Sequence, residues 1–225
     1  MSDQKQSVVI IDYGSGNIRS AAKAFEHVIT EHNLDFNVVV SGKAEEVGRA
    51  SHIVLPGQGA FGDCMQGLQA TGGMIAALEK AVLEDKKPFL GICVGMQLLA
   101  TRGLEFGEHQ GLGWIEGEVI PIKPNDKALK IPHMGWNVTD YPQGTNHPVL
   151  KNQEKNRSHF YFVHSFMFKC KEKDNVFGQT HYGGDVTAIV GKANMIGVQF
   201  HPEKSQEAGL TLLKDFLLWN PSKNC

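Results

Sequence analysis

The chain has 225 residues, of which 41% are apolar and 20% are charged, and its 22 basic and 24 acidic side chains leave a formal charge of −2. This near-neutral balance gives no reason to expect nucleic acid or an anionic membrane surface as a partner. No apolar run approaches the ~20 residues of a membrane-spanning helix, so no membrane association is predicted. The length suits one large domain with a substantial core, and we predict a single domain over residues 1–225.

Strands alternate with helices in the first part of the chain. Short β-branched runs predict buried strands, and apolar residues at helical spacing predict helices. The predicted strands are 7–12, 36–40, 52–56 and 88–92, and the predicted helices are 18–32, 74–83 and 94–101, with a short helix or turn at 43–50. This alternation predicts an α/β fold with a doubly wound, mostly parallel sheet of flavodoxin-like type, flanked by helices. Ligands of such sheets bind at the carboxyl ends of the strands.

The pattern changes after Gly103, where short alternating runs are separated by Gly, Pro, Asn and charged turns. We predict antiparallel strands here, added to the main sheet in the C-terminal half, and then a final helix over 205–219 with Ser205 as its N-cap. The predicted strands are 113–120, 129–138, 160–168, 175–182, 187–190 and 195–200.

The cysteines and histidines show no metal-binding pattern. The ten histidines are scattered, and the cysteines lie far apart at Cys64, Cys93, Cys170 and Cys225. Such spacing fits neither a zinc site nor a disulfide framework, and we expect no metal and no cofactor. Separated cysteines suit a reducing compartment, and the polar start of the chain lacks the apolar region of a signal peptide. We therefore expect a cytoplasmic protein.

Two glycine loops follow early strands. The first, 13–17, lacks the third glycine of a dinucleotide fingerprint, so we interpret it as a simple turn between strand and helix. The second, 56–62, reads PGQGAFG and follows a strand that ends in proline. Its glycines leave backbone N–H groups free to form half of an oxyanion hole, and the alternative is an ordinary turn.

Cys93 lies between a predicted strand and a predicted helix, with Gly91 and Gly95 on either side. This arrangement is the nucleophile-elbow pattern with cysteine in place of serine. A cysteine at a helix N-terminus is favoured as the thiolate. Taken alone, the motif fits a nucleophile and a buried core cysteine equally well.

His201 supplies a candidate base for this cysteine. It follows an apolar strand, and Glu203 comes two residues later, across Pro202. Residues i and i+2 of an extended segment face the same side, so the carboxylate can hold one imidazole nitrogen while the other faces Cys93. The alternative is a surface pair at a strand-to-helix turn. The elbow cysteine elsewhere in the chain favours the catalytic interpretation.

Three segments resemble the class-I (triad) glutamine amidotransferase family: PGQG at 56–59, GICVGMQLL at 91–99 and GVQFHPEKS at 197–205. Further segments resemble, within that family, the glutaminase subunits of imidazole glycerol phosphate synthases of histidine biosynthesis, and together they span nearly the whole chain. These segments are IDYGSGNIRS at 11–20, PGQGAFGD at 56–63, PHMGWN at 132–137 and YFVHSF at 161–166.

The resemblance implies hydrolysis of L-glutamine to glutamate and ammonia. Cys93 would attack the side-chain amide, His201 would act first as acid and then as base, and Glu203 would orient His201. The oxyanion would be held by the backbone N–H groups of Val94 and Gln58. In this family the Gln58 N–H is expected to point away until a partner engages.

The resemblance also implies a set of residues that bind the substrate. Glu105 would meet the α-ammonium group, although the family often has an acidic run here and this chain has TRGLE at 101–105; composition alone marks Glu105 as a surface acid. The whole expected set is Gly57, Gly59, Gln97, Glu105, His164, Ser165 and Phe166.

A second subunit is implied as well. Trp136, Asn137 and Asn17 would face a (β/α)8-barrel cyclase subunit in a heterodimer. Ammonia would pass through that barrel to a phosphoribulosyl-formimino-AICAR nucleotide, giving imidazole glycerol phosphate and AICAR. Without the resemblance, Trp136 reads equally well as a tryptophan that caps the core.

Three other functions stay open at this point. A paralogous amidotransferase subunit that supplies ammonia to a surface-sugar pathway would share these motifs. A cysteine hydrolase of related fold would cleave other amides. A partner-binding scaffold with a decayed site is the non-enzymatic alternative, and the complete set of Cys93, His201 and Glu203 argues against it.

Overall fold

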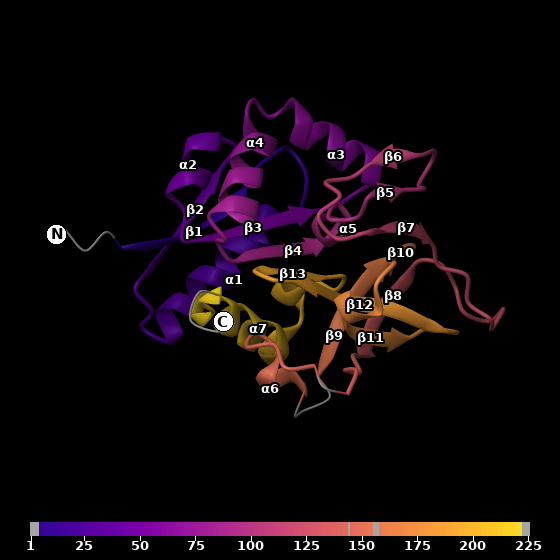
Figure 1. Ribbon diagram of the computed structural model, residues 1–225. Coiled ribbons are helices and arrows are strands. Elements are labelled where there is room, and N and C mark those ends of the chain that lie inside the picture. Colours follow the sequence, from indigo (N-terminus) through magenta and orange to yellow (C-terminus); the bar gives the residue numbers. More distant parts are fainter. Residues whose placement is uncertain (1–4, 144, 155–157, 222–225) are drawn as a thin grey trace.

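The computed structural model describes residues 5–143, 145–154 and 158–221, so Cys225 lies outside the described residues. A seven-stranded sheet in the order β11-β12-β13-β4-β3-β1-β2 forms its centre (Figure 1). Its five strands from β13 to β2 are parallel, and β12 and β11 are antiparallel. The strands are β1 (Gln6–Ile11), β2 (Phe36–Ser41), β3 (His52–Gly57), β4 (Phe89–Cys93), β11 (Val176–His181), β12 (Asp185–Lys192) and β13 (Met195–Val198).

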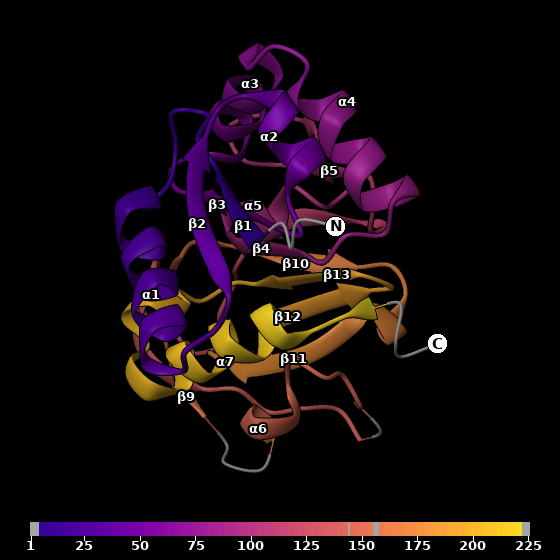
Figure 2. The same cartoon turned by 90° about the vertical axis from the view of Figure 1, so that its left-hand side faces the viewer.

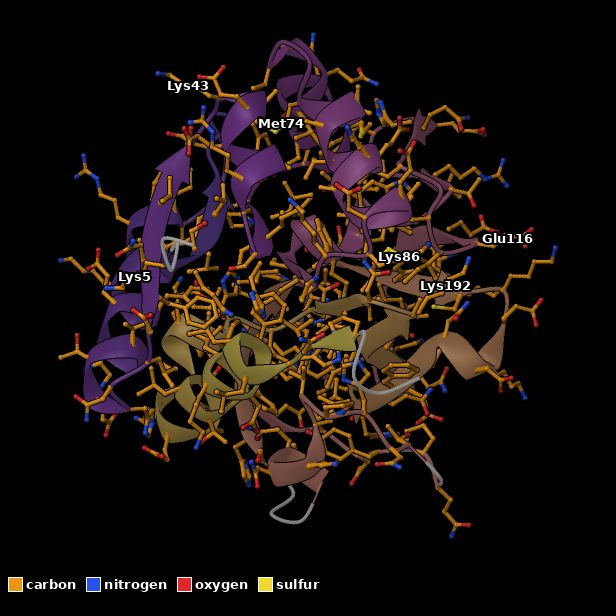
Figure 3. The ribbon with its side chains drawn as sticks, turned by 60° about the vertical axis from the view of Figure 1, so that its left-hand side comes forward. Lys5, Lys43, Met74, Lys86, Glu116 and Lys192 are labelled. Carbon is orange, nitrogen blue, oxygen red and sulfur yellow. The ribbon has the colours of Figure 1, made fainter. Side chains whose placement is uncertain are left out.

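Helices cover both faces of this sheet, which confirms the predicted doubly wound α/β fold (Figures 1 and 2). One face carries α1 (Ile18–Glu31) and α7 (Gln206–Leu218), whose Phe25 and Phe216 rings meet edge to face. The other carries α2 (Ala44–Arg49), α4 (Met74–Glu79) and its π-helical continuation η1 (Lys80–Glu84). Charged side chains such as Lys5, Lys43 and Glu116 point outward (Figure 3).

The strands of the C-terminal half depart from the prediction that they all join the main sheet. A second sheet has the order β10-β7-β5-β6, and β8 and β9 pair separately as a two-stranded ribbon. The predicted strand 160–168 is split at Ser165, because its first part pairs with β8 and its second part with β7. These strands are β5 (Arg102–Gly103), β6 (His109–Gln110), β7 (Gly117–Pro121), β8 (His133–Val138), β9 (His159–His164) and β10 (Phe166–Cys170).

Three helix predictions also need correction. Helix α3 (Phe61–Ala70) was not predicted, and α5 (Val94–Gln97) is shorter than predicted. The α5 helix stops because the carbonyl groups of residues 98 and 100 accept hydrogen bonds from the N–H groups of residues 112 and 113. Ser205 takes the predicted N-cap position of α7, but its hydroxyl donates to the His201 carbonyl group and makes no capping hydrogen bond. The remaining short elements are α6 (Lys151–Glu154), η2 (Lys173–Asn175) and η3 (Pro202–Lys204).

The carboxyl ends of the parallel strands gather the predicted motifs at one edge. In the register of β3 and β4, Gly57 lies opposite Cys93, and β13 pairs on the other side of β4. The segment after β13 therefore brings His201 to the edge at which Cys93 ends β4. Over the described ranges, every helix is too short or too polar to cross a membrane.

Candidate active site

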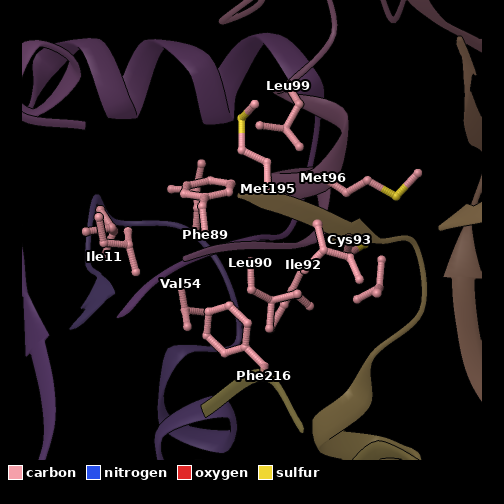
Figure 4. Close-up of a cluster of buried hydrophobic side chains, with 14 of the residues drawn as sticks. Ile11, Val54, Phe89, Leu90, Ile92, Cys93, Met96, Leu99, Met195 and Phe216 are labelled. Atoms are coloured by element: carbon pink, nitrogen blue, oxygen red, sulfur yellow. The ribbon is translucent and has the colours of Figure 1, made fainter. Parts of the chain in front are cut away.

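Cys93 ends β4 in a backbone conformation that few residues other than glycine adopt, with φ 55° and ψ −115°. The chain turns there from the buried strand directly into α5, and Figure 4 shows Cys93 next to Ile92 at the end of the strand. Gly95 permits this turn, because a Cβ at that position would collide with the Leu55 carbonyl oxygen. The geometry is that of a strained nucleophile elbow.

His201 and Glu203 lie at the same cavity as Cys93. The His201 ring lines that cavity together with the Cys93 side chain, and its Nδ1 lies 2.9 Å from Glu203 Oε1. Burial lowers the pKa of His201, but the hydrogen bonds and opposite charges of Cys93 and Glu203 outweigh burial and raise it to about 10. The imidazole is therefore protonated near neutral pH. Asn17, predicted at the partner face, donates to Glu203 Oε1 over 3.4 Å and so also steadies the carboxylate.

The predicted oxyanion loop is held by the first glycine loop. The Gln58 N–H donates to Ser15 Oγ at 3.3 Å, and the Ser15 hydroxyl donates to the Gln58 carbonyl group at 2.6 Å. The Tyr13 hydroxyl donates to the Pro56 carbonyl group at 2.8 Å, and Cys64 Sγ lies 3.2 Å from Ser15 Oγ. The segment 13–17 is thus a turn that braces the second loop, and the Gln58 N–H is engaged by Ser15.

A cavity of about 300 Å³ opens over Cys93, within the size range of small-molecule sites. Glu105 lies at its wall, with Oε2 accepting the Phe61 N–H at the start of α3 over 2.8 Å. Gly57, also predicted to bind substrate, is buried behind the wall. The lining residues are Gln58, Gly59, Cys93, Val94, Gln97, Glu105, Pro132, Val163, His164, Ser165, Phe166, His201 and Lys204.

Sequence reasoning missed one polar group beside the nucleophile. The side-chain amide of Gln199 donates from Nε2 to Cys93 Sγ at 3.7 Å and accepts from Gln97 Nε2 at 2.9 Å. Gln199 is fully buried and lies within the GVQFHPEKS segment. The signal was present, because residues 199 and 201 are two apart in an extended segment and face the same side.

The β8–β9 ribbon connects the cavity to the surface. On its outer side, Met134 and Trp136 are 61% and 48% exposed, which is unusual for large apolar side chains on neighbouring outward positions. Asn137 points to the inner side, where Nδ2 lies 3.2 Å from His133 Nε2. Nowhere in the described ranges do three or more His, Cys, Asp or Glu side chains come together as a metal site.

The comparisons with known proteins define the class. Residues 9–219 match the family model "Glutamine amidotransferase class-I", and the chain belongs to this family. Its fold is similar to a solved structure described as "Crystal structure of glutamine amidotransferase", with a TM-score of 0.65 and 18% identity over 93% of this chain and 98% of that one. The glutaminase domain of Trypanosoma brucei CTPS, with bound acivicin, gives a TM-score of 0.64 and 14% identity over 96% and 95%.

More similar sequences narrow the class. The chain is 51% identical to "Imidazole glycerol phosphate synthase subunit HisH" of Rhodospirillum rubrum, over 95% of this chain and 99% of the relative. It is also 51% identical to the protein of the same name from Zymomonas mobilis, over 98% and 100%. The chain therefore matches these HisH subunits over nearly their full length.

Proposed function

We propose that this chain is the glutaminase subunit of an imidazole glycerol phosphate synthase and hydrolyses L-glutamine to glutamate and ammonia. The observation that carries the proposal is the placement of Cys93 and the hydrogen-bonded pair of His201 and Glu203 at one cavity of about 300 Å³. The 51% identity to the two HisH subunits over nearly their full length supports the substrate and the pathway.

The first half-reaction releases ammonia. The Cys93 thiolate attacks the side-chain amide carbon of glutamine, and a C–S bond forms as the carbonyl oxygen becomes an oxyanion. The imidazolium of His201 then gives its proton to the amide nitrogen, the C–N bond breaks and ammonia leaves. Glu203, bonded to Nδ1, holds the ring in the orientation that this transfer requires. The product on the enzyme is a γ-glutamyl thioester.

The second half-reaction hydrolyses the thioester. His201, now neutral, takes a proton from water, the hydroxide adds to the thioester carbon, and the C–S bond breaks to return the thiolate and release glutamate. In both halves the oxyanion accepts hydrogen bonds from the N–H groups of Val94 and Gln58. Because one such donor typically lowers the barrier by ~3 kcal/mol, the Gln58 N–H must leave Ser15 before the site reaches full activity.

The cavity orients the substrate with groups of complementary charge. The Glu105 carboxylate at the cavity wall receives the α-ammonium group. Gln97 and the backbone at His164, Ser165 and Phe166 also line the cavity, and Gly59 leaves room for the chain of the substrate at the oxyanion loop, with Gly57 buried behind it.

A (β/α)8-barrel cyclase subunit docks on the face that carries Met134 and Trp136, near Asn17 and Asn137. Exposed aromatic side chains are common anchors of interfaces, and these two apolar groups stand together on the ribbon. Ammonia passes to the cyclase, because in bulk water it would be protonated and lose its nucleophilicity. The free thiols Cys64, Cys93 and Cys170 suit a cytoplasmic location.

Glutamate release from glutamine, measured with and without the cyclase subunit and its nucleotide ligand, tests the proposal. We expect the partner and the nucleotide to raise turnover, and we expect a Trp136→Ala variant to bind the partner ~30-fold more weakly. Turnover no higher than that of a Cys93→Ala variant under all conditions would overturn the proposal.

A further inference from the structure

Hydrogen-bonded polar groups run without a break from the β8–β9 ribbon to the nucleophile. We infer that Gln199 is a further catalytic residue that donates a hydrogen bond to Cys93 Sγ, and that Gln97, held on the Phe166 carbonyl oxygen, fixes its orientation. A second run of donors, which begins at Asn137, ends on the same oxygen. The inference rests on the proposed function in one respect, namely that Cys93 is the nucleophile.

The outer end of the chain is set by backbone groups around Asn137. Its Oδ1 accepts the Val138 N–H at 2.8 Å, and its Nδ2 donates to the His181 carbonyl oxygen at 3.0 Å. These two contacts fix which side of the amide carries the hydrogens. Nδ2 also lies 3.2 Å from His133 Nε2, so this nitrogen must accept. The proton of neutral His133 is therefore on Nδ1.

The contacts of His164 require the same tautomer of His133. His164 Nδ1 lies 2.9 Å from the Phe166 carbonyl oxygen, which can only accept, so Nδ1 carries the proton. His164 Nε2 must then accept, and its partner at 2.9 Å is the Nδ1–H of His133. Both rings are buried, and burial lowers the pKa of His133 to about 4 and that of His164 to about 3, which keeps both neutral. The two ends thus impose one consistent set of tautomers.

On the inner side, two glutamine side chains connect the Phe166 carbonyl group to the sulfur of Cys93. The Phe166 carbonyl oxygen also accepts from Gln97 Nε2 at 3.3 Å, which fixes the amide of Gln97. The same Nε2 donates to Gln199 Oε1 at 2.9 Å, so the amide nitrogen of Gln199 faces Cys93 Sγ at 3.7 Å. A rotated Gln199 amide would place two NH2 groups against each other and an oxygen against the thiolate. Gln97 and Gln199 are 3% and 0% exposed, so water cannot compensate such an error.

The chemical consequence concerns the thiolate in both half-reactions. A hydrogen bond to a charged acceptor is stronger than one to a neutral acceptor, and a thioester sulfur is a poor acceptor. The Gln199 amide therefore favours the thiolate before attack and stabilises it again as it leaves the thioester. No proton moves along the network, because donors from both sides meet at the Phe166 carbonyl oxygen, which cannot pass a proton on.

The first test changes that donor without changing its size. Gln199→Glu keeps an oxygen for Gln97, removes the N–H groups and adds a negative charge beside the sulfur. We expect alkylation of Cys93 by iodoacetamide at pH 7, mapped by mass spectrometry in the full chain, to slow by about 10- to 100-fold, with its pH midpoint moved upward. Gln69→Glu, which adds the same charge on the exposed side of α3, should leave both unchanged. An unmoved midpoint in the Gln199 variant overturns the inference, whatever happens to its thermal stability.

The second test needs no variant and so does not depend on whether one folds. Nitrogen-15 NMR of the histidine-labelled wild-type chain at pH 7 should show His133 and His164 neutral and protonated on Nδ1. A proton on Nε2 of either ring, or a charged ring, overturns the run of donors from Asn137 to the Phe166 carbonyl oxygen. Failure of the proposed function would appear differently, as wild-type glutamine turnover no higher than that of Cys93→Ala under all conditions.

Discussion

The two halves of the active site are in different states of assembly. On one side, the side chains of Cys93, His201 and Glu203 are buried, and His201 is hydrogen-bonded to Glu203. On the other side, the N–H of Gln58 is engaged by Ser15 rather than left for an oxyanion. In the proposed site, the His201–Glu203 pair is therefore already in place beside Cys93, whereas the proposed oxyanion donor, the Gln58 N–H, is bonded to Ser15.

The two halves differ in the free energy that is needed to rearrange them. Buried charges must be paired when the chain folds, because an unpaired buried charge costs several kcal/mol. A peptide N–H that exchanges one hydrogen-bond partner for another changes the free energy by only about 0.5–1.5 kcal/mol, and Gly57 and Gly59 beside Gln58 ease the rotation. Control over activity is therefore easier to place in the loop than in the triad.

Removing the nucleophile should have the largest effect. Cys93→Ala is expected to lower partner-stimulated glutamine turnover by ~10³-fold or more, because no other group can form the thioester. Cys170→Ala is the matched control: burial raises the pKa of the Cys170 thiol to about 12, which makes it unreactive near neutral pH, so turnover should stay unchanged. Equal losses in both variants would contradict the assignment.

Glu203→Gln tests the half of the site that contains Cys93, His201 and Glu203, at the residue farthest from the sulfur. Loss of the carboxylate removes one of the two groups that raise the pKa of His201, so the pH above which activity declines should move to lower values. Turnover at neutral pH should fall by ~10²-fold. Glu207→Gln, in the first turn of α7, provides a control with the same change of charge. An unchanged pH profile would show that Glu203 does not act through His201.

Ser15→Ala tests the unassembled half and should act in the opposite direction. Without its hydroxyl, the Gln58 peptide loses two hydrogen bonds that hold it away from the oxyanion position. Basal turnover without the partner should rise by about 2- to 10-fold, and the stimulation by the partner should shrink by a similar factor. Ser20→Ala on α1 is the control. A fall in basal turnover would mean that Ser15 supports the active loop instead.

The smallest predicted effect is on the pH dependence of stability. It has opposite signs for charged His201 and for the neutral buried histidines. Burial lowers the pKa of His52 to about 4, so between pH 6.5 and 4 the unfolded chain binds a proton that the folded chain does not. His52 thus lowers the free energy of unfolding by about 1.4 kcal/mol per pH unit as the pH falls through this range. His201, with its raised pKa, has the opposite sign and loses its contribution as the pH rises from 6.5 to about 10.

Urea unfolding of His52→Gln between pH 4.5 and 7 measures this slope. The variant should lose less stability on acidification than the wild type, by about 1.4 kcal/mol per pH unit. His27→Gln, on the exposed side of α1, should follow the wild type. Parallel curves for all three chains would contradict the assignment of His52.

The sequence predicted the parts of the site that local pattern determines. The elbow at Cys93 and the strand-end pair at His201 depend on spacing along one segment, and the structure brings both to one sheet edge. Helix α3 was missed although Phe61, Cys64, Met65 and Leu68 have helical spacing, because Gly62 and Gly67 weaken it and its first N–H is capped by distant Glu105.

The remaining parts depend on contacts between segments far apart in the sequence. Ser15 reaches Gln58 across 43 positions, and Gln97 reaches Gln199 across 102. A residue's own neighbours in the chain carry no signal for such pairs. Splitting of the predicted strand 160–168 has the same origin, because two different partner strands determine it.

The most direct test of the central claim compares two rates in the same chain, with and without the cyclase partner and its nucleotide. One is the alkylation of Cys93 by iodoacetamide, which reports the thiolate, and the other is glutamine turnover, which also requires the oxyanion hole. We predict that the partner raises turnover strongly and leaves the alkylation rate within about twofold. A parallel rise of both rates would show that the partner assembles the triad itself, and would contradict the account.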